Sequence, residues 1–235
     1  MKIKGKIPEA AIIAVGIIVL GFCIKAGIDN FVNKDRVVDV KGLSEMEVPA
    51  NLVTWPIVTK HMGNDLRDLY NRTNSTNTKI LAFLKTNGIK DDEITVNPPE
   101  VYDRDANEYA SEKAAERYHI TSVITVKSTQ VDKVREIISR QGELLQDGIA
   151  IVSGGYENNI EYEFTSFQDI KPKMMDEAIS KAKSTAEQFA NKCGSKLGKI
   201  ITADQGQFSI NDRDEHSPHI KSLRVVTTIT YQLKD

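Results

Sequence analysis

Residues 171–198 read KPKMMDEAISKAKSTAEQFANKCGSKLG, and their spacing sets the architecture of the C-terminal half. Apolar or small side chains return every three or four residues, which predicts an amphipathic helix that begins near Pro172 and ends at Gly194. The predicted apolar stripe is Met175, Ala178, Ile179, Ala182, Ala186, Phe189 and Cys193. Its alanines are small enough for another layer to approach closely. Cys193 falls on this stripe, so we expect a buried structural thiol rather than a redox-active one.

The same helical spacing occurs earlier, over residues 63–87, with Gly88 placed to end the helix. The clearest predicted strands are 118–126 and 224–233, which are rich in β-branched residues. Pro56 cannot donate to a strand ladder, so we expect an edge or a bulge there. Further elements are predicted as a helix over 131–141 and strands over 37–48, 52–58, 94–101, 149–152, 160–164 and 199–203. The pattern predicts an α+β fold with two lobes, each with a long helix packed on antiparallel sheet.

The N-terminal segment has a different character. Ala10–Ile24 is free of charge, and the apolar run continues four residues further if the stem of Lys25 snorkels to the interface. A helix of about 19 residues would cover roughly 28 Å, close to the hydrocarbon thickness of a bilayer. We expect a transmembrane anchor that contacts the membrane through residues 8–28. A cleaved signal peptide, or a lipoprotein signal at Cys23, is the alternative, but no small-residue cleavage site follows the run.

Net charge divides the chain in the same place. The 235 residues carry a formal charge of −2, made of +3 in residues 1–28 and −5 in the remainder. The positive-inside bias keeps the lysine-rich tip in the cytoplasm and predicts a single-pass inner-membrane protein with its C-terminal domain on the periplasmic, extracytoplasmic side. The expected organisation is therefore a tip and anchor over 1–28, a linker over 29–35 and one folded domain over 36–235.

Composition limits the partners. A chain without a strong basic field lacks the charge that nucleic-acid binders use to neutralise phosphates, so we expect no nucleic-acid partner. Hydrophobic residues make up 40% of the chain, and the apolar anchor accounts for part of that share. The folded domain is left with a modest core, so we expect contacts between subunits to contribute to its stability, as in a homo-oligomer.

Catalytic motifs are mostly missing. The stretch 194–199 (GSKLGK) is similar to a phosphate-binding loop, but it is one residue too short and follows a helix. The stretch 180–183 (SKAK) fits Ser-x-x-Lys without the companion motifs of that enzyme class. His61 and His119 have no neighbouring Ser or Cys nucleophile in the sequence, so we expect them to be structural. We therefore expect no enzyme and name no catalytic, cofactor-binding or metal residue.

Two other hypotheses remain open. The stretch 212–219 (DRDEHSPH) could bring carboxylates and the imidazoles of His216 and His219 together around a divalent cation, as in a metal-binding or hydrolytic enzyme. Pro218 breaks the helix that a zinc motif would need. An exposed polar loop over 103–112 could instead serve a binding module for a cell-envelope ligand.

The order of several features resembles the SIMPL domain family over residues 36–234. These features are Val38-x-Val40-x-Gly42, Glu47-Val48-Pro49-Ala50, Leu84-x-x-x-Gly88-Ile89, Tyr102 and Tyr118, and the alanine repeat that ends in Gly194-x-x-Leu197-Gly198. Two departures are Ala50, where the family commonly has Asp, and Pro56 within a strand. The resemblance implies a periplasmic or membrane-anchored protein with links to envelope or oxidative-stress tolerance, and some members form ring-like homo-oligomers. It implies no catalytic residues.

Overall fold

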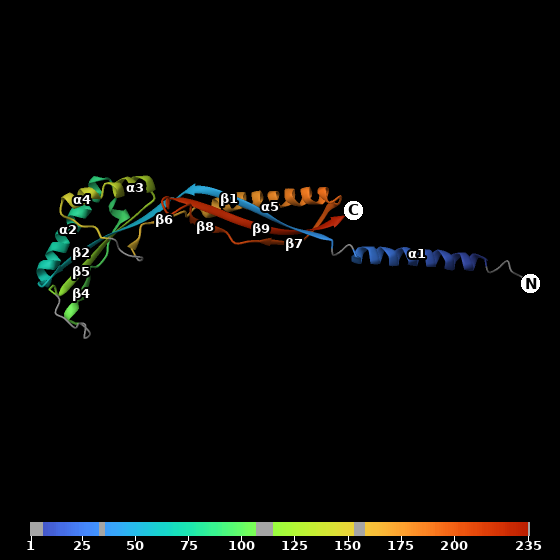
Figure 1. Cartoon of the computed structure of the whole chain (residues 1–235), viewed down its shortest axis with the longest axis horizontal. Coiled ribbons are helices and arrows are strands. Elements are labelled where there is room, and N and C mark those ends of the chain that lie inside the picture. The colour runs from blue at the N-terminus through green and yellow to red at the C-terminus, as the bar shows by residue number, and fades with distance from the viewer. Residues whose placement is uncertain (1–6, 33–35, 107–114, 153–157, 235) are drawn as a thin grey trace, which may run out of the picture. The chain divides into compact units, whose positions relative to one another are not determined.

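The fold is taken from a computed structural model of the chain (Figure 1). The structure describes residues 7–32, 36–106, 115–152 and 158–234. The chain divides into two compact units, each of which is described by itself. Unit 1 comprises Met1–Met46, Gln168–Ile210 and Leu223–Asp235, and unit 2 comprises Glu47–Phe167 and Asn211–Ser222.

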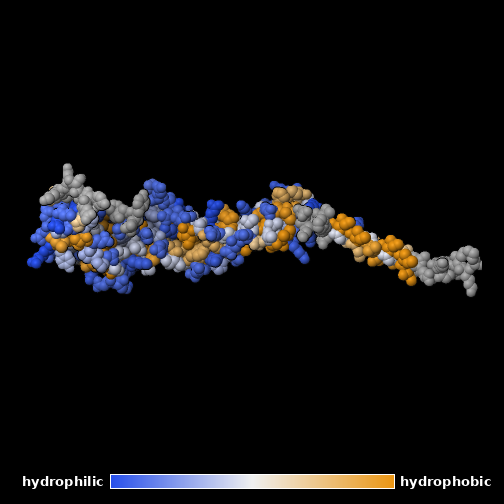
Figure 2. Space-filling model, turned by 90° about the horizontal axis from the view of Figure 1, so that it is seen from below, coloured by the Kyte–Doolittle hydropathy of each residue, from blue (hydrophilic) through white to orange (hydrophobic). Residues whose placement is uncertain are grey.

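The first element is an apolar helix, α1, over Ile7–Val32. Its segment Ala11–Ile28 is long and apolar enough to cross a membrane, and its side chains are exposed in the protein alone. Figure 2 shows mostly hydrophobic residues along this helix. A signal sequence near an N-terminus has the same properties, so the helix is either an anchor or a signal. Residues 29–32, predicted as linker, belong to the helix.

Unit 1 is one long helix on an antiparallel sheet. Helix α5 (Phe167–Lys192) packs on strands β1 (Val37–Pro49) and β9 (Ile220–Lys234) through a small apolar cluster that includes Ala182 and Ala186. The strand order is β1-β9-β7, with β7 over Lys196–Gln205, and the short β8 (Ser209–Asp212) also pairs with β9. The predicted long helix and final strand are therefore present, whereas β8 was not predicted.

The buried face of α5 is narrower than predicted. Its fully buried residues are Met174, Ala178, Ala182, Ala186 and Ala190. The prediction is wrong at Ile179, Phe189 and Cys193, which are exposed. It is also wrong at the start of the helix, because α5 begins at Phe167 and Pro172 lies inside it.

The close approach of α5 to β1 explains this narrow stripe. A Cβ atom added to Gly42 would lie 1.8 Å from the carbonyl oxygen of Ala178, so only glycine fits at this crossing. Two residues along the strand, the buried hydroxyl of Ser44 donates a hydrogen bond of 2.8 Å to the carboxylate of Glu177. At this separation a line of alanines fills the contact, and larger side chains beside the line stay exposed.

Unit 2 packs α2 (Leu66–Thr86) on a five-stranded antiparallel sheet. Its longest strands are β2 (Leu52–Gly63) and β5 (Tyr118–Ser128), which pair along eleven positions without a shift in register. The sheet order is β3-β5-β2-β6, and β4 also pairs with β5. The remaining elements of this unit are β3 (Ile94–Val96), β4 (Glu100–Asp103), α3 (Val131–Ser139), α4 (Gly142–Gln146) and β6 (Glu161–Glu163), with short 3-10 turns at Asp91–Glu93 and Arg104–Ala106.

Three predictions in unit 2 need correction. The predicted helix over 131–141 is two helices, α3 and α4, and the predicted strand over 149–152 is a single bridge between Thr59 and Ile151. The predicted strand over 94–101 is divided by its two prolines into β3 and β4. Pro56 lies past the end of the β6 pairing, which covers Leu52–Thr54, so a proline without an N–H group is tolerated there.

Candidate functional site

The acidic stretch 212–219 does not gather its carboxylates around a common point. The Lys221 ammonium pairs with the Asp212 carboxylate. Asp214 accepts hydrogen bonds of 2.9 Å from the guanidinium of Arg213 and from the backbone N–H of His216. The bond from Arg213 lowers the pKa of Asp214, because it stabilises the ionised form. The carboxylates of Asp212 and Asp214 are therefore already paired with groups inside the stretch or just after it.

The two histidines of this stretch have different surroundings. His216 is exposed, whereas His219 lies edge-on to the Tyr162 ring, with ring centroids 6.2 Å apart. Burial and the positive charges of Arg135 and Arg213 lower the pKa of His219. Across the described ranges, no group of three or more His, Cys, Asp or Glu side chains is placed to hold a metal ion. The hypothesis of a metal or hydrolytic centre at 212–219 therefore gains no support.

His61 and His119 are near each other in the sheet but face opposite sides. His61 pairs with Ile120 and His119 pairs with Met62, and neighbouring residues on a strand alternate between the two faces. The Nε2 atom of each histidine is buried without a hydrogen-bond partner. Burial, with a further contribution from Arg72, lowers the pKa of His61. The two imidazoles cannot act on one substrate.

The loop over 103–112 lies only partly within the described residues, which stop at 106 and resume at 115. At its base, the Arg117 guanidinium donates two hydrogen bonds, of 2.9 and 2.8 Å, to the Asp103 carboxylate. These bonds lower the pKa of Asp103. The Asn64 side chain accepts from the N–H of Arg117 and donates to the carbonyl of Ala115. Both ends of the loop are therefore fixed to the sheet.

The two motif-like stretches around α5 have ordinary structural positions. Ser180 is an exposed residue on the solvent side of α5. Gly194 has a φ of +69° after the helix, and strand β7 begins two residues later at Lys196. The stretch 194–199 is thus a helix-to-strand turn and the start of a strand, and not a loop that opens onto a helix N-terminus as phosphate binding requires.

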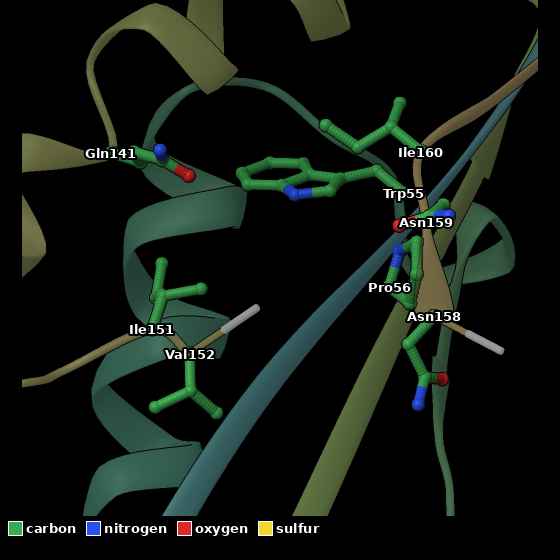
Figure 3. A pocket seen from close by; sticks show the side chains of 8 residues that line it. All are labelled: Trp55, Pro56, Gln141, Ile151, Val152, Asn158, Asn159 and Ile160. Carbon is green, nitrogen blue, oxygen red and sulfur yellow. The ribbon is translucent and has the colours of Figure 1, made fainter. Parts of the chain in front are cut away.

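Unit 2 contains a cavity of about 550 Å³ that the sequence did not reveal. Its lining residues are Trp55, Pro56, Gln141, Ile151, Val152, Asn158, Asn159 and Ile160. Figure 3 shows the indole ring of Trp55 across the cavity, with Gln141, Ile151 and Val152 on one side and the other lining residues opposite. Trp55 is only 2% exposed. Sequence analysis could not identify this cavity, because its lining residues come from three separate segments of the chain.

The free edge of the unit 1 sheet is the second feature that was not predicted from the sequence. Strand β7 pairs with β9 on one side, and no other described strand pairs with it. It is exposed along nearly its whole length, including Ile200 and Ile201 at 55% and 49%. Among the described strands, β1 likewise pairs only with β9. A long, exposed and apolar edge is a template for pairing with another chain.

Comparison with known proteins identifies a family whose function is unknown. The family model described as SIMPL, protein of unknown function (DUF541), matches residues 38–226, which covers most of the chain. No curated protein matches the sequence.

Proposed function

The chain belongs to the SIMPL (DUF541) family, and from this premise we propose that it is a membrane-anchored, extracytoplasmic scaffold that self-associates through the edges of its unit 1 sheet. The proposal contains no catalytic step, and we assign no catalytic residue. The observation that carries it is β7, a ten-residue edge strand exposed on both faces. The apolar helix α1 supports the anchor, and the lysines that precede it support the orientation.

The sheet offers two different edges, which suggests how copies would join. Strand β7 forms one edge and β1 forms the other, with β9 between them. When β7 of one copy pairs with β1 of the next, the contact is head-to-tail, and each added copy presents a new free edge. Such contacts generate a ring when the rotation closes and a filament when it does not. Pairing would also bury the exposed side chains of Ile200 and Ile201.

The assembly state of the full chain in detergent micelles tests this proposal. Light scattering should give a particle larger than a dimer. The change Ile201→Lys places a charge on the β7 edge and should shift the particles towards monomer. Ile179→Lys is the matched control, because Ile179 is an exposed isoleucine on α5, away from the edge. A strict monomer at tens of micromolar protein, or equal effects of the two substitutions, would remove the proposal.

The 30–235 fragment separates the anchor from the sheet. If the sheet edges carry the association, the fragment should assemble without detergent and should respond to Ile201→Lys in the same way. If association needs the apolar helix instead, the fragment will be monomeric, which contradicts a sheet-mediated scaffold.

A role in envelope or oxidative-stress tolerance belongs to the same proposal and rests on the family resemblance. We expect cells that lack the protein to be more sensitive to peroxide or envelope stress, and the unaltered chain to restore tolerance. The Ile201→Lys chain should fail to restore it. Full rescue by a chain that no longer assembles would separate the stress role from the scaffold.

A further inference from the structure

Strands β1 and β9 keep one register along the unit 1 sheet. Next to the start of β1, the Arg36 carbonyl accepts a hydrogen bond of 2.8 Å from the N–H of Leu233, near the end of β9. Three residues further along β1, the Asp39 carboxylate accepts one of 2.5 Å from the hydroxyl of Thr230, which lies three residues earlier in β9. The two strands are therefore antiparallel, and residues directly opposite each other can be read from these contacts.

One row of side chains crosses the three long strands and ends in opposite charges. The register of β1 and β9 places Lys41 opposite Thr228. On the other side of β9, Thr228 pairs with Asp204 of β7. Lys41 and Asp204 are both exposed. The β1 edge therefore carries a positive charge at the level where the β7 edge carries a negative one.

Helix α5 covers β1 and β9 but leaves most of β7 open on the same face. Its apolar cluster joins Ala182 and Ala186 to buried residues of β1 and β9, among them Tyr231. Ile200 of β7 pairs with Tyr231 and so lies on the same face, yet it is 55% exposed. A strip of β7 beside the helix is therefore uncovered in a single copy.

A second exposed apolar side chain lies on the side of α5 that overhangs the β1 edge. Glu177, directly before the buried Ala178, accepts the hydrogen bond from Ser44 of β1, which identifies this side. Phe189 has the same place before a later alanine of the buried stripe, and it is 50% exposed. Ala178 meets β1 at Gly42, and from there to Phe189 the helix advances about 16 Å, the length of about five strand residues. Phe189 therefore lies level with the start of β1.

We propose that Thr202–Gln205 of β7 pairs in parallel with Asp39–Gly42 of β1 in a second copy of this chain, so that the opposite charges of the row form an ion pair. Asp204 then lies beside Lys41 of the next copy, and such cross-strand pairs stabilise a sheet. The parallel direction rests on the anchored scaffold proposed above, because copies in one membrane start β1 from the same side. Strand β7 has the direction of β1, since both are antiparallel to β9.

The same placement brings α5 of the next copy over the open strip of β7. Three strands occupy about 14 Å, at about 4.8 Å each, and a helix with its side chains is about 10–12 Å across. Successive helices thus leave only a narrow gap above β7. Phe189 of the next copy is level with Ile200 in this gap, because Ile200 belongs to the row that reaches β1 at Val38. The two side chains, each exposed in a single copy, cover one another.

Disulfide formation between differently tagged, co-expressed full-length chains in detergent micelles tests the position of the helix. Cys23→Ala and Cys193→Ala remove the native thiols. Phe189→Cys in one chain and Ile200→Cys in the other should give a mixed dimer on oxidation, whereas either variant alone should give none. Ile179→Cys with Ile200→Cys is the matched control, because Ile179 is a similarly exposed residue directly after a buried alanine, on the other side of α5.

Charge reversal tests the row without using thiols. Asp204→Lys and Lys41→Asp should each raise the concentration of full chain at half assembly by about fivefold, measured by light scattering at low salt. The double reversal in one chain should restore the original value to within about twofold. Asp176→Lys is the matched control, since it makes the same change of charge at an exposed residue of α5 and should have no effect.

The outcomes separate this joint from the scaffold itself. A strictly monomeric chain overturns both. Particles larger than a dimer that give no mixed disulfide, and no rescue by the double reversal, overturn the joint and leave the scaffold standing. A disulfide in the Ile200→Cys protein alone would show β7 paired with a second β7, which also overturns the joint.

Discussion

At the scale of single residues, the contact between α5 and β1 depends on the missing side chain of Gly42. We predict that Gly42→Ala destabilises the protein by about 1–3 kcal/mol or more, the usual cost of overpacking. The added methyl group would lie 1.8 Å from the Ala178 carbonyl oxygen, and the backbone of α5 would have to move away. Urea unfolding followed by far-ultraviolet circular dichroism measures the loss.

A second glycine provides the control for this prediction. Gly142 begins α4, and a Cβ atom added there meets nothing within 4 Å. Gly142→Ala should leave stability unchanged or slightly improved, because alanine favours the helix. If both substitutions have the same effect, the close approach at Gly42 does not limit stability.

We predict that His61 makes the stability of unit 2 depend on pH. Burial and Arg72 lower the folded-state pKa of His61 below its ordinary value of 6.5, so the unfolded chain takes up the proton first as the pH falls. Stability should therefore decrease as the pH drops through about 6.5. His61→Gln should make this dependence shallower, as judged by urea midpoints from Trp55 fluorescence at several pH values. The exposed His216→Gln is the control, and equal slopes in all three proteins would contradict the assignment.

At the scale of elements, Asp65 fixes the start of α2. Its carboxylate accepts hydrogen bonds from the N–H groups of Arg67, at 2.8 Å, and Asp68, at 3.0 Å. Asp65→Ala should destabilise unit 2 by about 0.5–2 kcal/mol, the usual effect of a lost N-cap. Asp65→Asn should retain most of the stability, since asparagine caps as well as aspartate. Unfolding followed by Trp55 fluorescence compares the variants, and similar losses for both would argue against capping.

The helices and strands show which parts of the fold local sequence patterns can predict. Both long helices and the long strand β9 were predicted because their apolar periodicity repeats over many residues. The fold class and the apolar N-terminal helix are confirmed, and so is the family, which was inferred from the resemblance of several short motifs. The predicted stripe of α5 was too wide, since periodicity identifies a helix face but not how close the opposing layer comes. Gly42, which sets that distance, is separated from Ala178 by most of the chain.

The candidate sites could be predicted less well. The stretch 212–219 is rich in metal-ligating residue types, yet Lys221 and Arg213 take up two of its carboxylates. The Trp55 cavity and the β7 edge involve no local motif. They arise from pairing between distant segments, which a single sequence does not specify.

At the scale of the whole molecule, the two cysteines offer a test of orientation. Cys23 lies within the apolar segment of α1, whereas Cys193 is exposed after α5. With Cys23 replaced by Ala, a membrane-impermeant maleimide should label Cys193 in intact spheroplasts if the domain is extracytoplasmic. Labelling after lysis gives the total. Labelling that requires lysis would place the domain in the cytoplasm and contradict the proposed orientation.

The position of β9 also affects how the protein is made. This strand lies between β1 and β7, but the ribosome completes it after both of them. While the chain is being synthesised, the two flanking strands have no central partner, and their backbone groups remain open to other chains. A nascent chain stopped before residue 220 would lack the centre of the unit 1 sheet, and quality control would have to remove it. Slow codons or pauses late in the message would therefore affect yield more than equal delays within unit 2.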